Sequence, residues 1–263
     1  MTASPAEGVV MSDNKMISIE KRIPGSIRRN IIGCLRGALE EDLRQFKQWA
    51  RLATNNGIPF LKGDYINTRL QNELANEDIE IIPFTRYGWT SRVVVDHPNK
   101  MAYTVISKSR MNQLMKEAKN NAVPHYTLLF AYALNNDIIA PQKQLSIFDT
   151  IHFSDETMSD GYNKLLGGQL QRSVGYRYCV ITYEMGAGQL LGCEILMLDK
   201  DLDIITKIGL AEYITPEYAS LTQHNDAELN HAENQPRVKL KKGSVQGTPS
   251  LVSLKNEEQD KRA

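Results

Sequence analysis

Five acidic or imidazole side chains in the second half of the sequence have types and positions that could do chemistry. They lie in or beside segments whose pattern predicts strands, and they are Asp149, His152, Glu184, Glu194 and Asp199. Carboxylates at strand ends hold divalent ions in many metal-dependent nucleases, where the ion activates water and stabilises charge on the phosphate. A carboxylate beside a histidine can also orient one ring nitrogen. These residues therefore raise the hypothesis of a metal-dependent nuclease or related hydrolase.

The strongest of these candidates also have structural interpretations. Glu194 interrupts the apolar run LLGCEILML, and alternation places it on the sheet face opposite its two neighbours, where it can reach solvent or pair with Arg177 across a hairpin. No lysine follows it by two residues, so the Asp, Glu and Lys arrangement of many nuclease hairpins is absent. For His152, a structural hydrogen bond is the simpler role. We favour the structural interpretations, and we predict neither a metal site nor a cofactor.

A second group of side chains could bind a partner. Between residues 21 and 51 basic side chains outnumber acidic ones, and the stretch RYGWTSRVVVDHPNK, residues 86–100, combines arginines with aromatic rings. Cations contact phosphates, and rings stack on bases or pack against a partner protein. The candidate binding residues are Arg28, Arg29, Arg36, Arg86, Tyr87, Trp89, Arg92 and Lys100. The alternatives are a solvated helix face for the first three, and for Trp89 an anchor between the sheet and the following helix.

Composition excludes several classes of protein. The chain has 263 residues, of which 41% are hydrophobic and 24% charged, and its formal net charge of zero argues against a surface built wholly for phosphate. Three cysteines without CxxC spacing indicate neither a disulfide framework nor a zinc site. No apolar run approaches the roughly 20 residues of a membrane span, and the N-terminus lacks the order of a signal peptide. We therefore expect a cytoplasmic protein with no membrane partner.

Apolar residues at steps of three and four predict the N-terminal helices. One helix is predicted over residues 26–53, with a break near Gly37, because glycine weakens helices. A second is predicted over residues 64–75, with Asp64 as its N-cap. The apolar face of the first helix could also form the seam of a homodimer.

The rest of the chain alternates between strand and helix patterns. Period-two segments predict strands over residues 79–84, 90–96, 101–106, 176–184, 190–198 and 204–208. Between the third and fourth strands, helices are predicted over residues 108–121, 125–135 and 162–170, with His125 bonding backbone groups at a helix start. Because most strands are joined by short turns, we predict an α+β fold in which N-terminal helices precede a mainly antiparallel sheet with packed helices.

Four regions are predicted along the chain. Residues 1–22 form a disordered N-terminus, residues 23–76 a helical region, residues 77–221 an α+β domain, and residues 222–263 a disordered polar tail.

Three segments resemble known sequences: RYGW…VVVDHPNKMAYTVISKSRMNQL, PHYTLLFAYALNN and YRYCVITYE. Their order resembles a family of uncharacterised bacterial proteins found in firmicute genomes and their mobile elements, over about residues 60–215. The resemblance implies a bacterial or phage cytoplasmic protein of α+β type, without an activity to assign to particular residues.

The sequence therefore favours a non-enzymatic binding or regulatory protein that recognises nucleic acid or a partner protein, in a phage-host or mobile-element setting. The alternative is a metal-dependent nuclease or related hydrolase.

Overall fold

The structure, a computed structural model, describes residues 19–117, 123–138, 153–167, 170 and 175–214. All described residues belong to the first of the two units into which the chain divides. Within the described residues, none of the helices combines the length and the apolar character needed to cross a bilayer.

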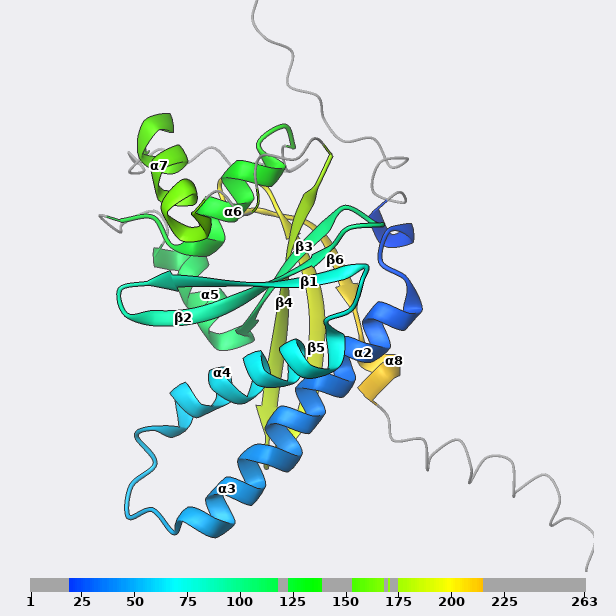
Figure 1. Cartoon of the computed structure of the whole chain (residues 1–263), viewed down its shortest axis with the longest axis vertical. Helices are drawn as coiled ribbons and strands as arrows, with labels where there is room; N and C mark the ends of the chain where they lie inside the picture. Colours follow the sequence, from blue (N-terminus) through cyan, green and yellow to red (C-terminus); the bar gives the residue numbers. More distant parts are fainter. Residues whose placement is uncertain (1–18, 118–122, 139–152, 168–169, 171–174, 215–263) are drawn as a thin grey trace, which may run out of the picture. The chain divides into compact units, whose positions relative to one another are not determined.

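Helices surround a six-stranded sheet in the described part of the first unit (Figure 1). The helical elements are α2 (Gly25–Arg36), the π-helical turn η1 (Gly37–Asp42), α3 (Leu43–Ala50), α4 (Ile58–Arg69), the π-helical turn η2 (Leu70–Leu74), α5 (Lys108–Glu117), α6 (Tyr126–Asn135), α7 (Asp155–Leu166) and α8 (Ala211–Ile214). The strands are β1 (Ile79–Arg86), β2 (Trp89–Asp96), β3 (Met101–Ser107), β4 (Arg177–Gly186), β5 (Gln189–Leu198) and β6 (Ile204–Gly209). Each strand boundary lies within two residues of its prediction.

The strands lie in the order of the sequence, β1-β2-β3-β4-β5-β6. All neighbouring pairs are antiparallel except β3 and β4, which are parallel. A parallel pair cannot be joined by a hairpin, and here the crossover between the two strands carries α5, α6 and α7. The predicted α+β class, with N-terminal helices and a mainly antiparallel sheet, is confirmed.

The sheet separates two hydrophobic cores, because successive side chains of a strand point to opposite faces. On one face α2 and η2 contribute Ile31, Leu35 and Leu70 to a core shared with the sheet. On the other face α6 and α7 contribute Phe130 and Tyr162. The predicted helical region and the sheet thus share one core. The apolar face considered for a homodimer seam is covered by this core, since Ile31 and Leu35 are fully buried.

The predicted start of the second helix was wrong. The helix begins at Ile58, six residues before Asp64, and Pro59 lies in its first turn. Proline is tolerated there because the first turn needs no intrahelical N–H bond. Asp64 is therefore an interior residue, and its backbone carbonyl accepts a hydrogen bond from the Thr68 hydroxyl at 2.8 Å.

The break predicted near Gly37 is a π-helical turn, through which the backbone stays helical. A Cβ atom on Gly37 would lie 2.8 Å from the guanidinium carbon of Arg69. The glycine thus permits the close approach of an arginine and does not end the helix.

The helix predicted over residues 162–170 begins earlier, at Asp155, and ends at Leu166. The Ser154 side chain caps it by accepting from the Thr157 N–H, and Gly167 closes it in the left-handed conformation. Disorder predicted for residues 1–22 and 222–263 falls almost wholly outside the described residues, although Ile19, which is described, is buried.

The β1–β2 hairpin leaves the rest of the sheet at one end. β2 pairs with β1 along its whole length but with β3 only from Val94 to Asp96. β3 stays paired with β4 as far as Ser107. In Figure 1 the hairpin accordingly runs across the view, whereas β4 and β5 run down it. Strand β2 therefore separates from β3 and leaves a gap in the sheet.

Candidate functional site

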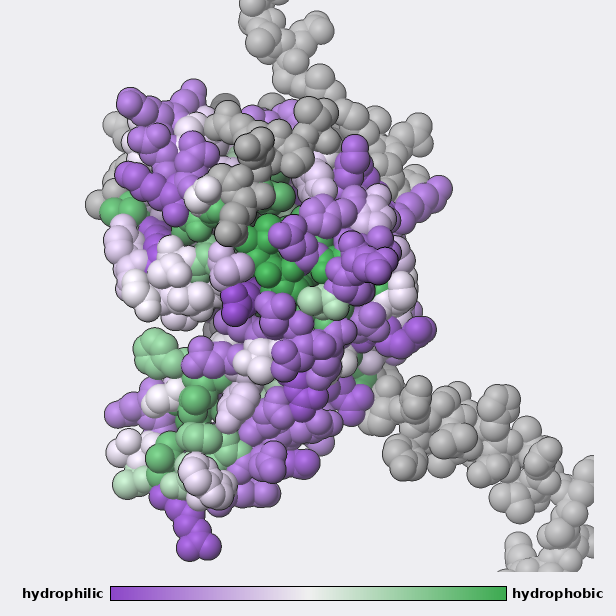
Figure 2. Space-filling model, in the orientation of Figure 1, coloured by the Kyte–Doolittle hydropathy of each residue, from purple (hydrophilic) through white to green (hydrophobic). Residues whose placement is uncertain are grey.

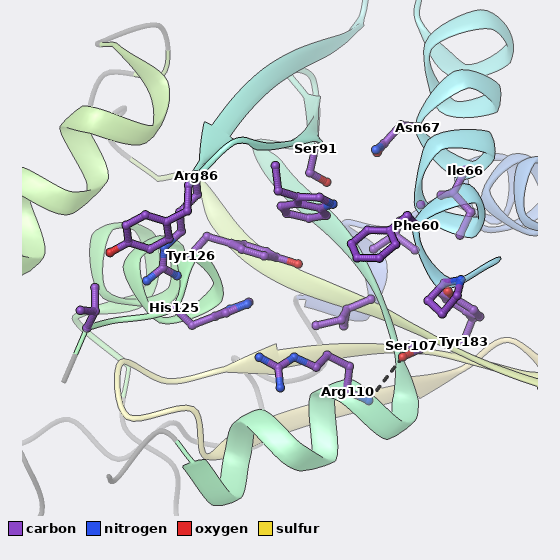
Figure 3. Close-up of a pocket in the computed structure, with 17 residues that line it drawn as sticks. Phe60, Ile66, Asn67, Arg86, Ser91, Ser107, Arg110, His125, Tyr126 and Tyr183 are labelled. Atoms are coloured by element: carbon purple, nitrogen blue, oxygen red, sulfur yellow. Dashed lines mark hydrogen bonds between the residues drawn. The ribbon is translucent and has the colours of Figure 1, made fainter. Parts of the chain in front are cut away.

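A pocket of about 620 Å³ lies where β2 separates from β3. Its walls come from α4, the β1–β2 hairpin, the end of β3, the start of α5, the first residues of α6, and Tyr183 on β4 (Figure 3). The volume falls within the range of about 300–1,000 Å³ typical of ligand sites.

Stacked rings form one side of the pocket. Trp89 stacks on Tyr126 with ring centroids 5.7 Å apart, and the His125 ring lies 4.1 Å from the Tyr126 ring. Phe84 supports them from the core, 5.1 Å from Tyr126. Trp89 thus anchors the hairpin to α6, whereas the structural alternative named the helix that directly follows the hairpin, and it still exposes 37% of its surface. Across the pocket, Phe60 of α4 is 67% exposed.

The charged groups of the pocket are cations. Arg86 and Arg110 line it, and no Asp or Glu occurs among its described lining residues. Arg86 lies over the Tyr87 ring at 5.1 Å and forms no ion pair within the described part of the chain. Arg110 pairs with Glu117 at 3.3 Å, outside the lining, and 43% of its side chain is exposed. The pocket therefore offers positive charge to a ligand.

His125 adds an uncharged hydrogen-bond donor. Burial, helped by the charges of Arg86 and Arg110, lowers the pKa of His125 to about 3, so the ring is neutral at physiological pH. Its Nδ1 accepts from the Thr127 N–H at 3.2 Å, as predicted for a histidine at a helix start, and this leaves the proton on Nε2. In Figure 3, His125 lies between Tyr126 and Arg110 and points into the pocket.

Comparison with protein families finds a match over residues 20–253 to DUF5986, a family of unknown function. The chain belongs to this family. No curated protein and no solved structure matches the chain. The family match is longer than the resemblance described from the sequence, which covered about residues 60–215, and it includes the N-terminal helices.

In this DUF5986 protein, three of the predicted binding residues come together. Arg86, Tyr87 and Trp89 all line the pocket, because a tight turn at Tyr87 and Gly88, both with positive φ, holds the strand ends side by side. Arg92, farther along β2, does not line it.

The other predicted binding residues lie elsewhere. Lys100 is exposed in the turn after β2. Arg28 donates to the backbone carbonyls of Ile23 and Glu20 at 2.9 and 2.8 Å, and Arg36 pairs with a carboxylate one helical turn later at 3.2 Å. Arg28 thus ties α2 to the residues before it, and Arg36 forms an ion pair within one continuous helical stretch. Arg29 is exposed on α2.

Two of the candidate carboxylates are neighbours. Glu194 lies opposite Thr182, two residues before Glu184, so both glutamates are on the same face of the sheet. Lys108 donates to Glu184 at 3.0 Å, and Lys207 pairs with Glu194 at 2.7 Å. Each carboxylate is therefore neutralised by its own lysine.

Among the remaining catalytic candidates, Asp199 does not join this pair. Asp199 is buried in a turn, where its Oδ1 accepts from the N–H groups of Asp201 and Asp203 at 2.9 Å. Asp149 and His152 lie outside the described residues. Arg177, which was one of two alternatives for Glu194 beside exposure to solvent, forms two 2.7 Å bonds with Asp137. In the described part of the chain, no three metal-ligating side chains converge.

Several lining residues were not predicted. Phe60 and Asn67 come from α4, whose first turns were missed, and Arg110 and Tyr183 come from distant elements. Phe60 had one sequence signal, because Pro59 beside it marks a helix start as readily as a helix end. For Arg110 and Tyr183 the sequence carried no signal. Tyr183 reaches the pocket through the parallel pairing of β3 with β4, and Arg110 through the position of α5 directly after β3.

Proposed function

We propose that this protein binds single-stranded nucleic acid and takes an unpaired nucleotide into the pocket between α4 and the β1–β2 hairpin. The observation that carries the proposal is the composition of the pocket. Aromatic rings and two arginines line it, and no described lining residue is acidic.

The rings suit a base. Phe60 and Trp89 both line the pocket and have exposed surface, and each stacking contact between a base and an aromatic side chain contributes about 1–3 kcal/mol. Such contacts need an unstacked base, which a single strand offers and a duplex does not.

The cations suit the phosphate. The guanidinium groups of Arg86 and Arg110 can form paired hydrogen bonds to phosphate oxygens, and the Nε2–H of His125 adds a neutral donor. Because the whole chain has zero net charge, binding would depend on this local arrangement and not on a general attraction to polyanions.

Fluorescence anisotropy with labelled single-stranded DNA and RNA at low salt tests the proposal. We expect binding that weakens as salt rises, and a loss of about tenfold or more in Arg86→Gln, since a contact to a charged group contributes about 1.5–3 kcal/mol. Arg29→Gln is the matched control, because Arg29 is exposed and does not line the pocket.

Absence of binding to any strand, or equal losses in the two variants, would contradict the proposal. Capture of an acidic peptide with the same dependence on Arg86 would replace nucleic acid by a partner protein.

The proposal includes a biological setting: a cytoplasmic regulatory protein of a bacterium, or of a phage or mobile element that the bacterium carries. The sequence resemblance supports this setting, and membership of a family of unknown function leaves it open. The neighbouring genes test it. A chromosomal position without phage or mobile-element genes would count against it.

One observation favours a metal-dependent nuclease as the second candidate. Glu184 and Glu194 share a sheet face, and Lys108 donates to Glu184 at 3.0 Å. This hydrogen bond, together with the charge of Glu194, raises the pKa of Lys108. Two carboxylates and a lysine are the side-chain types that such a site uses. Incubation of single-stranded and plasmid DNA with Mg²⁺ or Mn²⁺ tests this candidate. Cleavage that disappears in Glu194→Gln would support it, whereas no cleavage by the wild type would exclude it.

A further inference from the structure

A basic arm extends from the helical region. We define the arm as residues 43–63, which comprise α3, the following turn and the start of α4. It contains four basic residues and no acidic one, and the basic residues are Arg44, Lys47, Arg51 and Lys62. The first three are exposed, and none of them forms an ion pair within the described residues.

The cations that flank the arm behave differently. Arg36 pairs with Glu40 at 3.2 Å. Arg69 forms two 2.7 Å bonds to Asp42 and one of 2.6 Å to Glu73. Acidic partners are therefore supplied where arginines hold helices together, and they are absent along the arm.

The three exposed cations follow one another along α3 and its C-cap. Arg44 and Lys47 are three residues apart and share a face of α3, and Arg51 comes directly after the helix as its C-cap residue, in the left-handed conformation. At about 1.5 Å per residue they span about 10 Å. Three cations over that length can contact neighbouring phosphates of one nucleic-acid strand.

Part of the apolar side of the arm packs against α4. Phe46 packs against Tyr65 of α4 with ring centroids 6.4 Å apart, so α4 lies on the side of α3 away from the cations. The turn at residues 54–57 reads TNNG and has no large apolar side chain. In Figure 2, hydrophilic and hydrophobic surface lie side by side over α3 and α4 at the lower left.

These features favour a polyanion over a lipid bilayer. Membrane-surface helices bury a whole apolar face in the lipid, whereas here Phe46 packs against Tyr65 of α4. The exposed apolar side chains of the arm, Trp49 at 80%, Leu52 at 50% and Phe60 at 67%, lie on α3, the following turn and α4 and not on one helix face.

We propose that the arm binds the phosphate backbone of the same nucleic acid whose unpaired nucleotide enters the pocket, and this inference rests on the proposed function. Phe60 belongs both to the arm and to the pocket wall, so the two surfaces adjoin. Because α4 lies between the cations and the pocket, only a strand of several nucleotides reaches both. The pocket then selects an unpaired nucleotide, and the arm makes affinity depend on strand length.

The test compares two triple variants of the full chain. Arg44→Gln, Lys47→Gln and Arg51→Gln together remove the cations of the arm. Lys116→Gln, Lys164→Gln and Lys200→Gln together remove the same charge from exposed positions outside it. Binding of oligothymidylates of about 3 and about 20 nucleotides is measured across a salt series. Thermal unfolding checks that each variant is folded.

We expect the arm variant to bind the long strand about tenfold or more weakly, with a salt slope smaller by about 2, as the loss of three phosphate contacts predicts. Its affinity for the short strand should match that of the wild type. The control variant should keep the wild-type slope for both strands.

Equal affinities and slopes of the arm and control variants for the long strand would overturn this inference and leave the pocket as the binding site. A wild type that binds neither oligonucleotide would overturn the proposed function, and this inference with it. Sedimentation with anionic phospholipid vesicles, lost only in the arm variant and without oligonucleotide binding, would assign the arm to a membrane surface and overturn the inference.

Discussion

Arg69 and Arg86 show two uses of the same side chain. Arg69 is enclosed by carboxylates, with two 2.7 Å bonds to Asp42 and one of 2.6 Å to Glu73, and these bonds raise its pKa. Arg86 lines a pocket without acidic residues and lies over the ring of Tyr87. A charge count treats the two alike, yet the first joins helices and the second is available to a ligand. The position of the carboxylates, not the number of cations, distinguishes a structural arginine from a binding one.

Replacing Arg69 gives the largest expected effect on this contrast. Arg69→Met should lower the free energy of unfolding by about 2–3 kcal/mol, because Asp42 and Glu73 lose a partner, with some relief from solvent since the arginine is 26% exposed. Oligonucleotide affinity should stay unchanged. Urea denaturation measures the first quantity, with Arg86→Gln as the matched variant that should change stability by less than about 0.5 kcal/mol. If Arg69→Met lowered the free energy of unfolding by less than about 1 kcal/mol, Arg69 would contribute as little to stability as Arg86, and the contrast would fail.

Trp89→Ala tests the contribution of an aromatic ring of the pocket to single-strand binding. Loss of one stacking ring should weaken single-strand binding by about 10- to 100-fold, the equivalent of about 1–3 kcal/mol. The chain has two tryptophans, so Trp49→Ala is the control. In Trp49→Phe, Trp89 is the single tryptophan, and its fluorescence should be quenched by an oligonucleotide. Quenching of Trp49 in Trp89→Phe, and none in Trp49→Phe, would place the ligand elsewhere.

His125 gives the pocket a pH dependence that the Arg69 network should lack. Its pKa is about 3 in the folded protein and near 6.5 in the unfolded chain, so the unfolded chain binds the proton more readily between these values. Stability from the neutral ring is fully present above pH 6.5 and is lost as pH falls toward 3.

His125→Asn keeps a capping side chain and removes this titration. Between pH 6.5 and about 4.5, the wild type should lose on the order of 1 kcal/mol more stability than the variant, measured by denaturation at each pH. Parallel losses in the two proteins would mean that His125 already carries a proton in the fold.

The smallest effect is expected at the ion pair of Glu194 with Lys207. Glu194→Gln should change the free energy of unfolding by less than about 1 kcal/mol, because Lys207 is 53% exposed and surface ion pairs contribute little. Single-strand affinity should also be unchanged. A larger loss of stability would show that this carboxylate, like those around Arg69, is part of the framework.

Local patterns predicted the elements better than their ends. Period-two alternation located all six described strands because side chains on the two faces of a strand alternate between two cores. Helix starts were harder to predict, since a proline such as Pro59 is compatible with either side of a helix boundary. Ser154 followed by Asp155 and Glu156 was a capping signal for α7 that went unused.

Part of the pocket lining could be predicted from the sequence. Arg86, Tyr87 and Trp89 were predicted together because they are neighbours in one hairpin, and a turn of two residues keeps them so. Phe60, Arg110 and Tyr183 joined them only through the tertiary fold. Arg28 and Arg36 were predicted as binding residues because they are basic, whereas the structure uses them within the helical region.

By itself, the sequence determined the fold class, the strands and the hairpin that carries the aromatic and arginine side chains, because periodicity and turn residues act over a few positions. Only the tertiary structure decided which cations have acidic partners and where a pocket opens. Both depend on contacts between residues far apart in the chain, such as Arg69 with Asp42, and on the point at which β2 stops pairing with β3.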